Sequence, residues 1–276
     1  MIERRKDDFT ERDYARLLDL AAASYRFVDI PEALDDSDPT PAVVWRHDVD
    51  YSPHRALSLA RVEHAKGLRC VYHFMISSRY YNVLEPEISD LLRQISDLGH
   101  FLGLHVDMDV FGKSDVPSEV DIEARVLLER NVLEHCLDRP LTSFSFHNVV
   151  VNAGRLAEKT KLAGLDNASV AVKEKSMRYV SDSNGLWRYE RLDAVLSEPP
   201  HRRLMVLTHP VWWTAESCSP YQCLERCVTG RAEANLAFYI DLLTRDGRLL
   251  PIAEASGLPK DLVERVTAAT RRAAGE

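Results

Sequence analysis

The chain has 276 residues, of which 45% are hydrophobic and 28% charged, a composition typical of a globular protein with a substantial core. Its formal net charge of -8 argues against nucleic acid as a partner, because nucleic-acid binding calls for a basic face. No apolar run reaches the roughly 18 residues that a membrane span needs, and residues 1–8 lack the apolar core of a signal peptide. We therefore expect a cytoplasmic protein with no membrane partner.

Apolar runs rich in strand-forming residues alternate along the chain with amphipathic helical stretches. The first strand is predicted over Ala42–Arg46, and Ser52 and Pro53 then begin a helix that ends at Gly67. Later strands are predicted over Cys70–Met75, Phe101–His105, Thr142–His147, Ser169–Val172, Arg178–Ser181 and Leu204–Thr208. Later helices are predicted from Pro86 to Leu98, from Ile122 to Leu137, from Ala234 to Leu243, and around Leu262, Val263 and Val266.

Alternation of this kind indicates parallel βαβ units joined by right-handed crossovers. We therefore predict an α/β fold, a distorted (β/α) barrel with about seven parallel strands, similar to a TIM barrel. One domain is expected over residues 1–276, with an N-terminal helical extension over 1–40 and a C-terminal helix over 256–276. Because reacting groups gather at the carboxyl ends of the strands in such barrels, the polar residues that end these strands should form one site.

The segment Arg46-His47-Asp48-Val49-Asp50 closes the first predicted strand and begins the predicted site. Asp48 and Asp50 stand two residues apart, so their side chains leave an extended chain on the same side. Two carboxylates in one small space repel each other unless a cation or a shared proton intervenes. The pair therefore suits metal binding, proton abstraction, or one carboxylate for each task.

His105, His147, Asp182 and His209 stand at or just beyond the ends of four later predicted strands. In a parallel sheet these ends meet at one edge, so we expect the four side chains to converge on the carboxylate pair. A mixture of carboxylate and imidazole ligands suits zinc and other first-row divalent ions.

In order and character, five segments resemble the motifs of the polysaccharide deacetylase superfamily, also called carbohydrate esterase family 4. The Gly-His-x-x-Gly-x-His pattern at Gly99–His105 is the most specific match. The other segments are Arg46–Asp50, the strand end at His147, Ser181–Ser183 and Leu207–Pro210, so the resemblance runs from about Val43 to Pro210. It is closest to the branch whose first motif is Arg-His-Asp-x-Asp. Members of the family are metal-dependent N- or O-deacylases with a distorted (β/α) barrel.

The resemblance implies a role for each matched residue. Asp48 would be the general base that activates the attacking water, and Asp50 would be a metal ligand. His105 would be the first histidine ligand, and His209 the general acid that protonates the leaving amine. Asp182 would orient His209 or its neighbours.

The resemblance also implies a substrate pocket. Leu207 and Trp187 would line the small apolar space for the acyl methyl group. Trp212 and Trp213 directly follow the expected acid, where they either offer a sugar ring an apolar face or pack at the barrel rim.

The chain departs from the family pattern at two positions near the metal. The family usually has a second histidine four residues after the first, and here that position is Asp109. The third motif usually begins with an arginine, and here the matching residue is His147. We expect His147 to supply the missing imidazole ligand, with Asp109 as the alternative third ligand. The competing interpretation of His147 is a histidine that hydrogen-bonds Asp48 or the substrate.

These residues lead us to expect a metal-dependent hydrolase that removes an acyl group, expected to be acetyl, from the nitrogen of an intracellular amino sugar or sugar precursor. The cofactor would be one divalent ion, expected to be zinc, and the process carbohydrate metabolism such as polysaccharide biosynthesis. One alternative substrate is a non-sugar C–N bond, in a formamide, ureide or cyclic amide. Another alternative is a non-catalytic barrel that binds carbohydrate or a partner. The joint presence of Asp48 and His209 argues against it, since a binder needs neither base nor acid.

Overall fold

The computed structural model describes residues 4–35, 37–111, 118–147, 159–246, 259–261 and 264. Its residue contacts divide the chain into two compact units, residues 1–224 and residues 225–276. The helix expected over residues 256–276 falls mostly outside the described residues. Within the described ranges, no helix has both the length and the apolar character to cross a membrane. The sheet and all the candidate site residues lie in the first unit.

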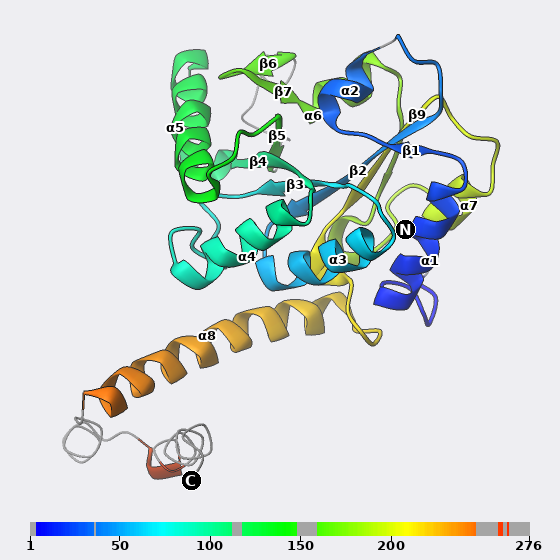
Figure 1. Cartoon of the computed structure of the whole chain (residues 1–276). Helices are drawn as coiled ribbons and strands as arrows, with labels where there is room; N and C mark the ends of the chain where they lie inside the picture. Colours follow the sequence, from blue (N-terminus) through cyan, green and yellow to red (C-terminus); the bar gives the residue numbers. More distant parts are fainter. Residues whose placement is uncertain are drawn as a thin grey trace. The chain divides into compact units, whose positions relative to one another are not determined.

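The first unit is built on one curled sheet whose strands are almost all parallel (Figure 1). The strands are β1 (Arg26–Phe27), β2 (Ala42–Val49), β3 (Val71–Phe74), β4 (Phe101–Asp107), β5 (Ser143–His147), β6 (Lys161–Leu162), β7 (Leu165–Asn167), β8 (Arg178–Ser181) and β9 (Arg203–Thr208). Their order across the sheet is β6-β7-β5-β4-β3-β2-β9-β8, and β1 pairs with the start of β2. The antiparallel pair is β6 with β7. This half-barrel agrees with the predicted α/β fold and its distorted barrel.

The helices of the first unit are α1 (Glu11–Ala22), α2 (Ile30–Leu34), α3 (Pro53–Ala65), α4 (Pro86–Asp97), α5 (Glu119–Leu137), α6 (Ala168–Glu174) and α7 (Leu192–Leu196). Among the described residues, 3₁₀ turns are η1 (Met108–Phe111), η3 (Ser183–Gly185) and η4 (Pro210–Trp212). Helix α8 (Pro220–Arg245) begins in the first unit and continues into the second. The helix starts predicted at Ser52 and Pro86 are confirmed, and Ser52 caps α3 by accepting a hydrogen bond from the Arg55 backbone N–H at 3.2 Å.

Strands β2, β3, β4, β5, β8 and β9 confirm the strands predicted at these places, but the strand predicted over Ser169–Val172 is wrong. That segment lies in helix α6. The side-chain oxygen of Asn167 accepts hydrogen bonds from the backbone N–H groups of Ser169 and Val170, at 3.0 and 3.4 Å, and so caps a helix. Periodicity alone does not separate a strand from a helix in so short an apolar run, and the cap decides between them.

Residues 4–35, within the expected helical extension, are built into the first unit. They supply α1 and α2, and also strand β1, which pairs with β2. Just before α1, the buried ring of Phe9 lies 5.4 Å from the Trp187 ring and 5.0 Å from the Trp213 ring.

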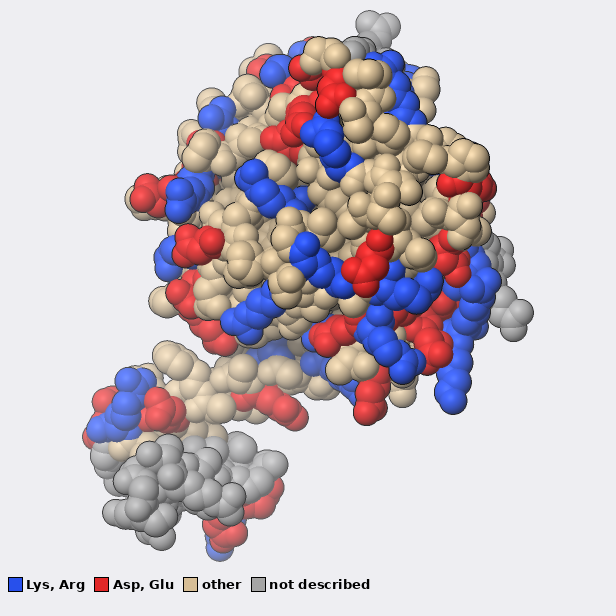
Figure 2. Space-filling model, turned by 45° about the vertical axis from the view of Figure 1, so that its right-hand side comes forward, with Lys and Arg blue, Asp and Glu red and all other residues tan. Residues whose placement is uncertain are grey.

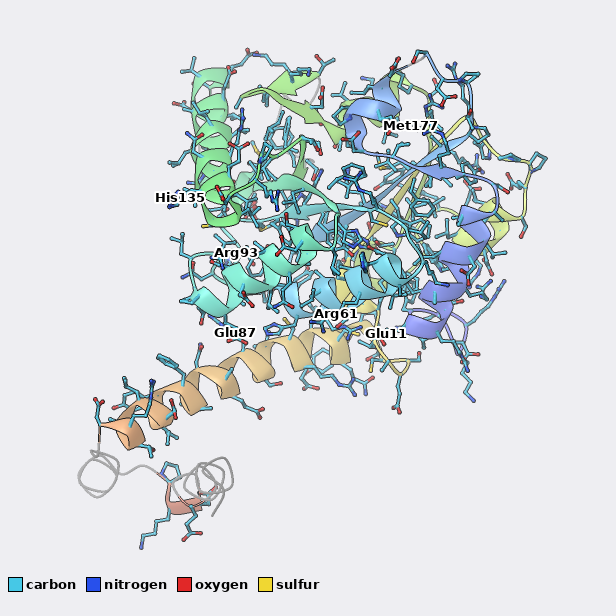
Figure 3. All side chains as sticks on the ribbon, in the orientation of Figure 1. Glu11, Arg61, Glu87, Arg93, His135 and Met177 are labelled. Atoms are coloured by element: carbon cyan, nitrogen blue, oxygen red, sulfur yellow. The ribbon has the colours of Figure 1, made fainter. Side chains whose placement is uncertain are left out.

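Polar contacts join the helices that cover one face of the sheet. His54 Nε2 of α3 lies 3.2 Å from Glu87 Oε1 of α4, and Arg93 of α4 donates to the Cys136 carbonyl of α5 at 3.1 Å (Figure 3). On the face shown in Figure 2, basic and acidic side chains are interspersed rather than gathered by sign. Both contacts lie at the surface of the helix layer.

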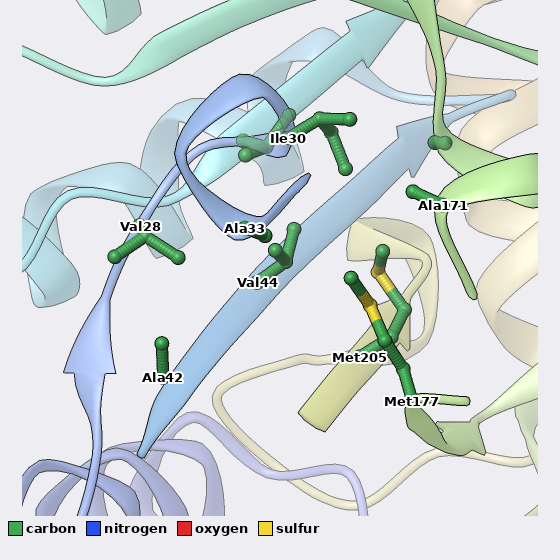
Figure 4. Packing of buried hydrophobic residues seen from close by; sticks show 10 residues of the cluster. Val28, Ile30, Ala33, Ala42, Val44, Ala171, Met177 and Met205 are labelled. Carbon is green, nitrogen blue, oxygen red and sulfur yellow. The ribbon is translucent and has the colours of Figure 1, made fainter. Parts of the chain in front are cut away.

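Successive side chains point to opposite faces of the sheet, and one face carries an apolar cluster below a polar layer. The cluster consists of Val28, Ile30, Ala33, Ala42, Val44, Val71, Ala168, Ala171, Met177 and Met205 (Figure 4). On β2, Ala42 and Val44 of this cluster share a face with Arg46 and Asp48, which come later in the strand. The cluster therefore fills the half-barrel toward the strand starts and leaves the polar positions at the strand ends.

Gly103 on β4 lies under the polar layer at a position with no room for a side chain. In register it lies between His73 of β3 and Ser143 of β5. A Cβ atom at Gly103 would overlap the imidazole of His73 and come within 2.8 Å of the Ser143 carbonyl oxygen. Any side chain there therefore displaces buried atoms of both neighbours.

We expect Gly103→Ala to lower the free energy of unfolding by about 1–3 kcal/mol, since overpacking a close contact forces side chains and backbone to shift. Urea unfolding of the purified protein measures the change. Gly230→Ala is the control, because a Cβ there meets no atom within 4 Å and alanine favours a helix over glycine. Equal stability of Gly103→Ala and wild type would show that His73 can move at no cost.

Glu63 of α3 is a fully buried carboxylate on the opposite face of the sheet. The Tyr14 hydroxyl donates to its Oε1, the Tyr72 hydroxyl donates to its Oε2 at 2.7 Å, and His47 Nε2 lies 2.7 Å from Oε1. His47 Nδ1 lies in turn 2.8 Å from Thr208 Oγ1 of β9. Glu63 thereby links α1, α3, β2, β3 and β9 behind the strand ends.

We expect Glu63→Gln to lower the free energy of unfolding by about 2–5 kcal/mol at pH 7, because it weakens a buried charged hydrogen-bond network. Burial alone would raise the pKa of Glu63, but His47, His100 and Tyr14 hold it below its usual value. The stabilisation is therefore complete above the unfolded-state pKa of about 4.3 and is lost as the pH falls through the lower folded-state pKa.

Urea unfolding at pH 7 and at pH 3 tests this, with the exposed Glu87→Gln as the control that leaves stability unchanged at both values. The difference in free energy of unfolding between Glu63→Gln and wild type should be smaller at pH 3 than at pH 7. A gap of the same size at both pH values would contradict the role of the Glu63 charge.

Candidate active site

A cavity of about 410 Å³ opens at the carboxyl ends of the strands. It is lined by Arg46, Asp48, Asp50, Tyr51, His105, Phe146, His147, Ser169, Tyr179, Ser183, Asn184, Arg188, Leu207, His209 and Trp212. Seven of the residues predicted for the site are therefore present in one cavity. Asp182 lies behind the lining, while Trp187, Trp213 and Asp109 do not line it.

Asp50, His105 and His147 come together at the ends of β2, β4 and β5, as the strand order led us to expect. His105 Nε2 lies 3.2 Å from Asp50 Oδ1 and 3.2 Å from His147 Nδ1. His147 Nδ1 lies 3.5 Å from Asp50 Oδ1. Ligand atoms placed 2.0–2.2 Å from a tetrahedral ion stand about 3.3–3.6 Å from one another, so these separations match one coordination sphere.

The unmet hydrogen-bonding capacity of Asp50 also fits a cation. Oδ1 of Asp50 is buried and accepts no hydrogen bond from the described residues. An unsatisfied carboxylate oxygen at this depth is costly unless a cation or a donor approaches it. One carboxylate and two imidazoles form a donor set that suits zinc and leaves a position open for a further ligand.

Ser145 of β5 orients the His105 imidazole toward this cluster. Its Oγ lies 2.7 Å from His105 Nδ1 and 2.7 Å from His73 Nδ1, and it donates to Asp48 Oδ1 at 3.4 Å. When Nδ1 of His105 donates to the serine, Nε2 carries the lone pair that a metal would take. Burial holds the pKa of His73 well below its usual value, so His73 is a neutral support for Ser145.

Asp48 is held differently from Asp50. Arg46, two residues earlier on the same strand face, donates from Nη2 to Asp48 Oδ2 at 2.9 Å. Burial alone would raise the pKa of Asp48, but Arg46, together with the neighbouring histidines, lowers it well below its usual range. Asp48 is thus an ionised carboxylate tied to an arginine, 3.7 Å from His105 Nε2 and outside the group of three.

On the other side of Asp50, His209 is paired with Asp182. Asp182 Oδ1 lies 2.6 Å from His209 Nδ1, and both carboxylate oxygens accept from the His209 backbone N–H at 3.1 and 3.0 Å. Trp213 donates from its indole nitrogen to Asp182 Oδ2 at 2.8 Å. Burial alone would lower the pKa of His209, but Asp182 and then Asp50 and Asp48 raise it to about 9. His209 Nε2 faces the cavity, 3.9 Å from Asp50 Oδ2.

Two tryptophans expected in the substrate pocket lie in the core instead. Trp187 and Trp213 are 3% and 0% exposed, with ring centroids 6.0 Å apart, and both pack against Phe9. Neither presents a ring face to the cavity, so the expectation of substrate contact is corrected for both. Leu207 and Trp212 do line the cavity.

Asp109 is also placed away from the cluster. It is exposed in η1, where its backbone N–H donates to Asp107 Oδ1 at 3.0 Å. Its side chain is not among the three that converge, so His147 and not Asp109 stands beside Asp50 and His105.

A second group of ligand-type side chains, His47, Glu63 and Cys70, lies fully buried on the other face of the sheet. Both oxygens of Glu63 already accept from tyrosine hydroxyls. A satisfied carboxylate of this kind is a structural network and not a cation site.

Sequence reasoning missed Arg46, Ser145 and Arg188. Arg46 stands at the same two-residue spacing from Asp48 as Asp50 does, and Ser145 stands two residues before His147. Alternation along the two strands could therefore have placed both in the site. Arg188 comes from a loop, for which no periodic signal exists.

Comparison of the chain with protein-family models gives no match, and comparison with curated proteins gives none either. Among solved structures, it is similar to a CE4 family pseudoenzyme from Bacillus anthracis, at 13% identity and a TM-score of 0.39, over 72% of this chain and 66% of that one. It is also similar to the chitin deacetylase of the fungal pathogen Colletotrichum lindemuthianum, at 14% identity and a TM-score of 0.37, over 68% of this chain and 81% of that one. The deacetylase domain of BpsB from Bordetella bronchiseptica gives 10% identity and a TM-score of 0.38, over 76% and 88%. Likenesses at these levels do not establish a shared activity.

Proposed function

We propose that this protein is a metal-dependent hydrolase that removes an acyl group, in the first instance acetyl, from the nitrogen of an amino sugar or sugar precursor. The observation that carries the proposal is the different environment of two neighbouring carboxylates. Asp50 faces two imidazoles at metal-ligand spacing, whereas Asp48 is tied to Arg46. The pair His209–Asp182 stands on the far side of Asp50.

A divalent ion held by Asp50, His105 and His147, with zinc favoured by the donor set, would supply Lewis acidity to a water molecule and to the acyl carbonyl. Asp48 accepts the proton of the attacking water through a carboxylate oxygen. His209 donates the proton on Nε2 to the leaving nitrogen as the C–N bond breaks. The products are an amine and a carboxylate.

The other groups in the cavity support this assignment. Leu207 and Trp212 provide apolar surface for an acyl methyl group. Asp182 fixes the His209 ring through its side chain and its backbone at once. A protein that only binds carbohydrate has no use for an ionised base on one side of the cluster and a protonated histidine on the other, and this favours an enzyme.

The test pairs metal analysis of the purified protein with assays of acetate release from a panel of N-acetylated sugars. We expect about one divalent ion per chain and acetate release that chelation abolishes. Turnover of a formamide, ureide or cyclic amide without turnover of the sugars would show that the same site acts on a non-sugar substrate. Sugar binding without turnover of any substrate in the metal-loaded protein would overturn the proposal.

A further inference from the structure

Arg188 is the one cation lining the cavity that, among the described residues, has no carboxylate or hydrogen-bond partner for its side chain. Its guanidinium lies over the ring of its neighbour Tyr189, 5.1 Å from the ring centroid, and it is exposed. The other arginine of the lining, Arg46, is 5% exposed and donates to Asp48. Arg46 is therefore engaged by the site, whereas Arg188 is available to a ligand.

The loop that carries Arg188 is fixed in place at several points. The Arg188 backbone N–H donates to the Ser181 carbonyl at the end of β8, at 3.1 Å. The preceding residue, Trp187, is packed against Phe9 and Trp213. Gly185 has a φ of +70°, and a Cβ atom there would approach Pro220 to 2.8 Å. These contacts fix the backbone from which Arg188 extends to the cavity and, among the described residues, leave the hydrogen-bond donors of its guanidinium unused.

With the proposed metal bound, no carboxylate of the cavity requires Arg188 as its counterion. Asp48 is matched by Arg46, and Asp182 is matched by His209. Asp50 is the carboxylate of the proposed metal centre, where a divalent ion carries more charge than one carboxylate neutralises. Arg188 therefore adds to a surplus of positive charge, and a cavity of that kind attracts anions.

We propose that the substrate is an N-acylated compound that also carries an anionic group, a carboxylate or a phosphate, and that Arg188 binds this group. This inference rests on the proposed function. A guanidinium matches the two oxygens of either anion with parallel N–H donors. Ser183 and Asn184 line the cavity from the same loop and offer hydrogen bonds to the neighbouring hydroxyl groups of a sugar.

The experiment compares three acetylated probes that differ at one carbon. They are N-acetylglucosamine, the corresponding N-acetylglucosaminuronate and N-acetylglucosamine 6-phosphate. We expect wild type to prefer at least one anionic probe, and Arg188→Ala to lower the ratio of anionic to neutral kcat/KM by about 10- to 100-fold, mainly through KM. Arg188→Lys should recover part of the preference for the anionic probe. Comparison of the phosphate probe with the uronate probe identifies which anion Arg188 binds.

Arg139→Ala is the matched control, since Arg139 is an exposed arginine that does not line the cavity. Its ratio of anionic to neutral kcat/KM should equal that of wild type. Binding of the three probes is measured in parallel by calorimetry, so that the inference is tested even if no probe is hydrolysed. Loss of anion binding in Arg188→Ala supports the inference without turnover, and an unchanged preference in rate and binding overturns it.

Discussion

Asp48→Asn is expected to remove most turnover while the metal stays bound, and Asp50→Asn to remove the metal as well. Asp48 is tied to Arg46 through the 2.9 Å contact, so it is held as a proton acceptor rather than a ligand. Its amide replacement takes away a general base, which contributes about 10²–10⁴-fold to rate. Asp50 faces His105 and His147 at 3.2 and 3.5 Å, so its amide replacement removes the charged ligand. Metal content by elemental analysis and turnover of the same preparations measure both effects.

Asp109→Asn is the matched control for this pair of variants. Asp109 holds the position of the second family histidine but is exposed in η1, so its variant should keep both metal and turnover. Loss of metal from Asp109→Asn would restore it as the third ligand in place of His147. Equal metal content in the Asp48 and Asp50 variants would show that the two carboxylates share one role.

The meeting of Asp50, His105 and His147 was predictable because it depends on two regular features. Two-residue alternation places side chains of one strand on a common face, and parallel strands bring their carboxyl ends to one edge. β4 lies between β3 and β5 in the order that chain sequence suggests, so no unexpected crossover intervenes. Alternation and parallel strand ends, together with the curl of the sheet, therefore bring the three residues near one another although β3 separates β2 from β4.

The tryptophans could not be placed in this way, because their partner is distant in sequence. Phe9 precedes the first helix, yet its ring packs against both the Trp187 and the Trp213 rings. A motif centred on His209 contains no information about that contact. Both indoles are therefore structural. Trp187 anchors the loop that carries Arg188, and Trp213 donates a hydrogen bond to Asp182.

The separate roles of Asp48 and Asp50 also depend on contacts that a motif does not state. Both stand on one side of one strand, and either could have met the histidines. The arginine at position 46 forms its ion pair with Asp48, and Ser145 donates to the same carboxylate. Sequence spacing indicated that one carboxylate could serve each task. The contacts with Arg46 on the same strand and with Ser145 on β5 single out Asp48 as the carboxylate outside the group of three.

His209→Ala should reduce hydrolysis of an amide far more than hydrolysis of an activated ester of the same acyl group. The amine is a poor leaving group that requires a proton, and a positioned acid supplies about 10²–10⁴-fold. An activated phenol leaves without that help. Parallel assays of kcat on the two substrates give the comparison, and a loss by the same factor on both would make His209 a binding or structural residue.

The pH dependence of amide hydrolysis also tests whether His209 is the general acid. A general acid works only while protonated, so the rate should hold as the pH rises through neutrality and fall at alkaline pH, because Asp182 raises the pKa of His209 above its usual value. Asp182 makes the largest contribution to raising that pKa, through the 2.6 Å contact with Nδ1. Asp182→Asn should therefore move the alkaline limb to lower pH, because the imidazolium loses its compensating charge. Trp213→Phe, which removes one donor to Asp182 and keeps an aromatic ring, should leave the limb near its wild-type position. An alkaline limb that stays in place in Asp182→Asn would mean that a group other than His209 delivers the proton.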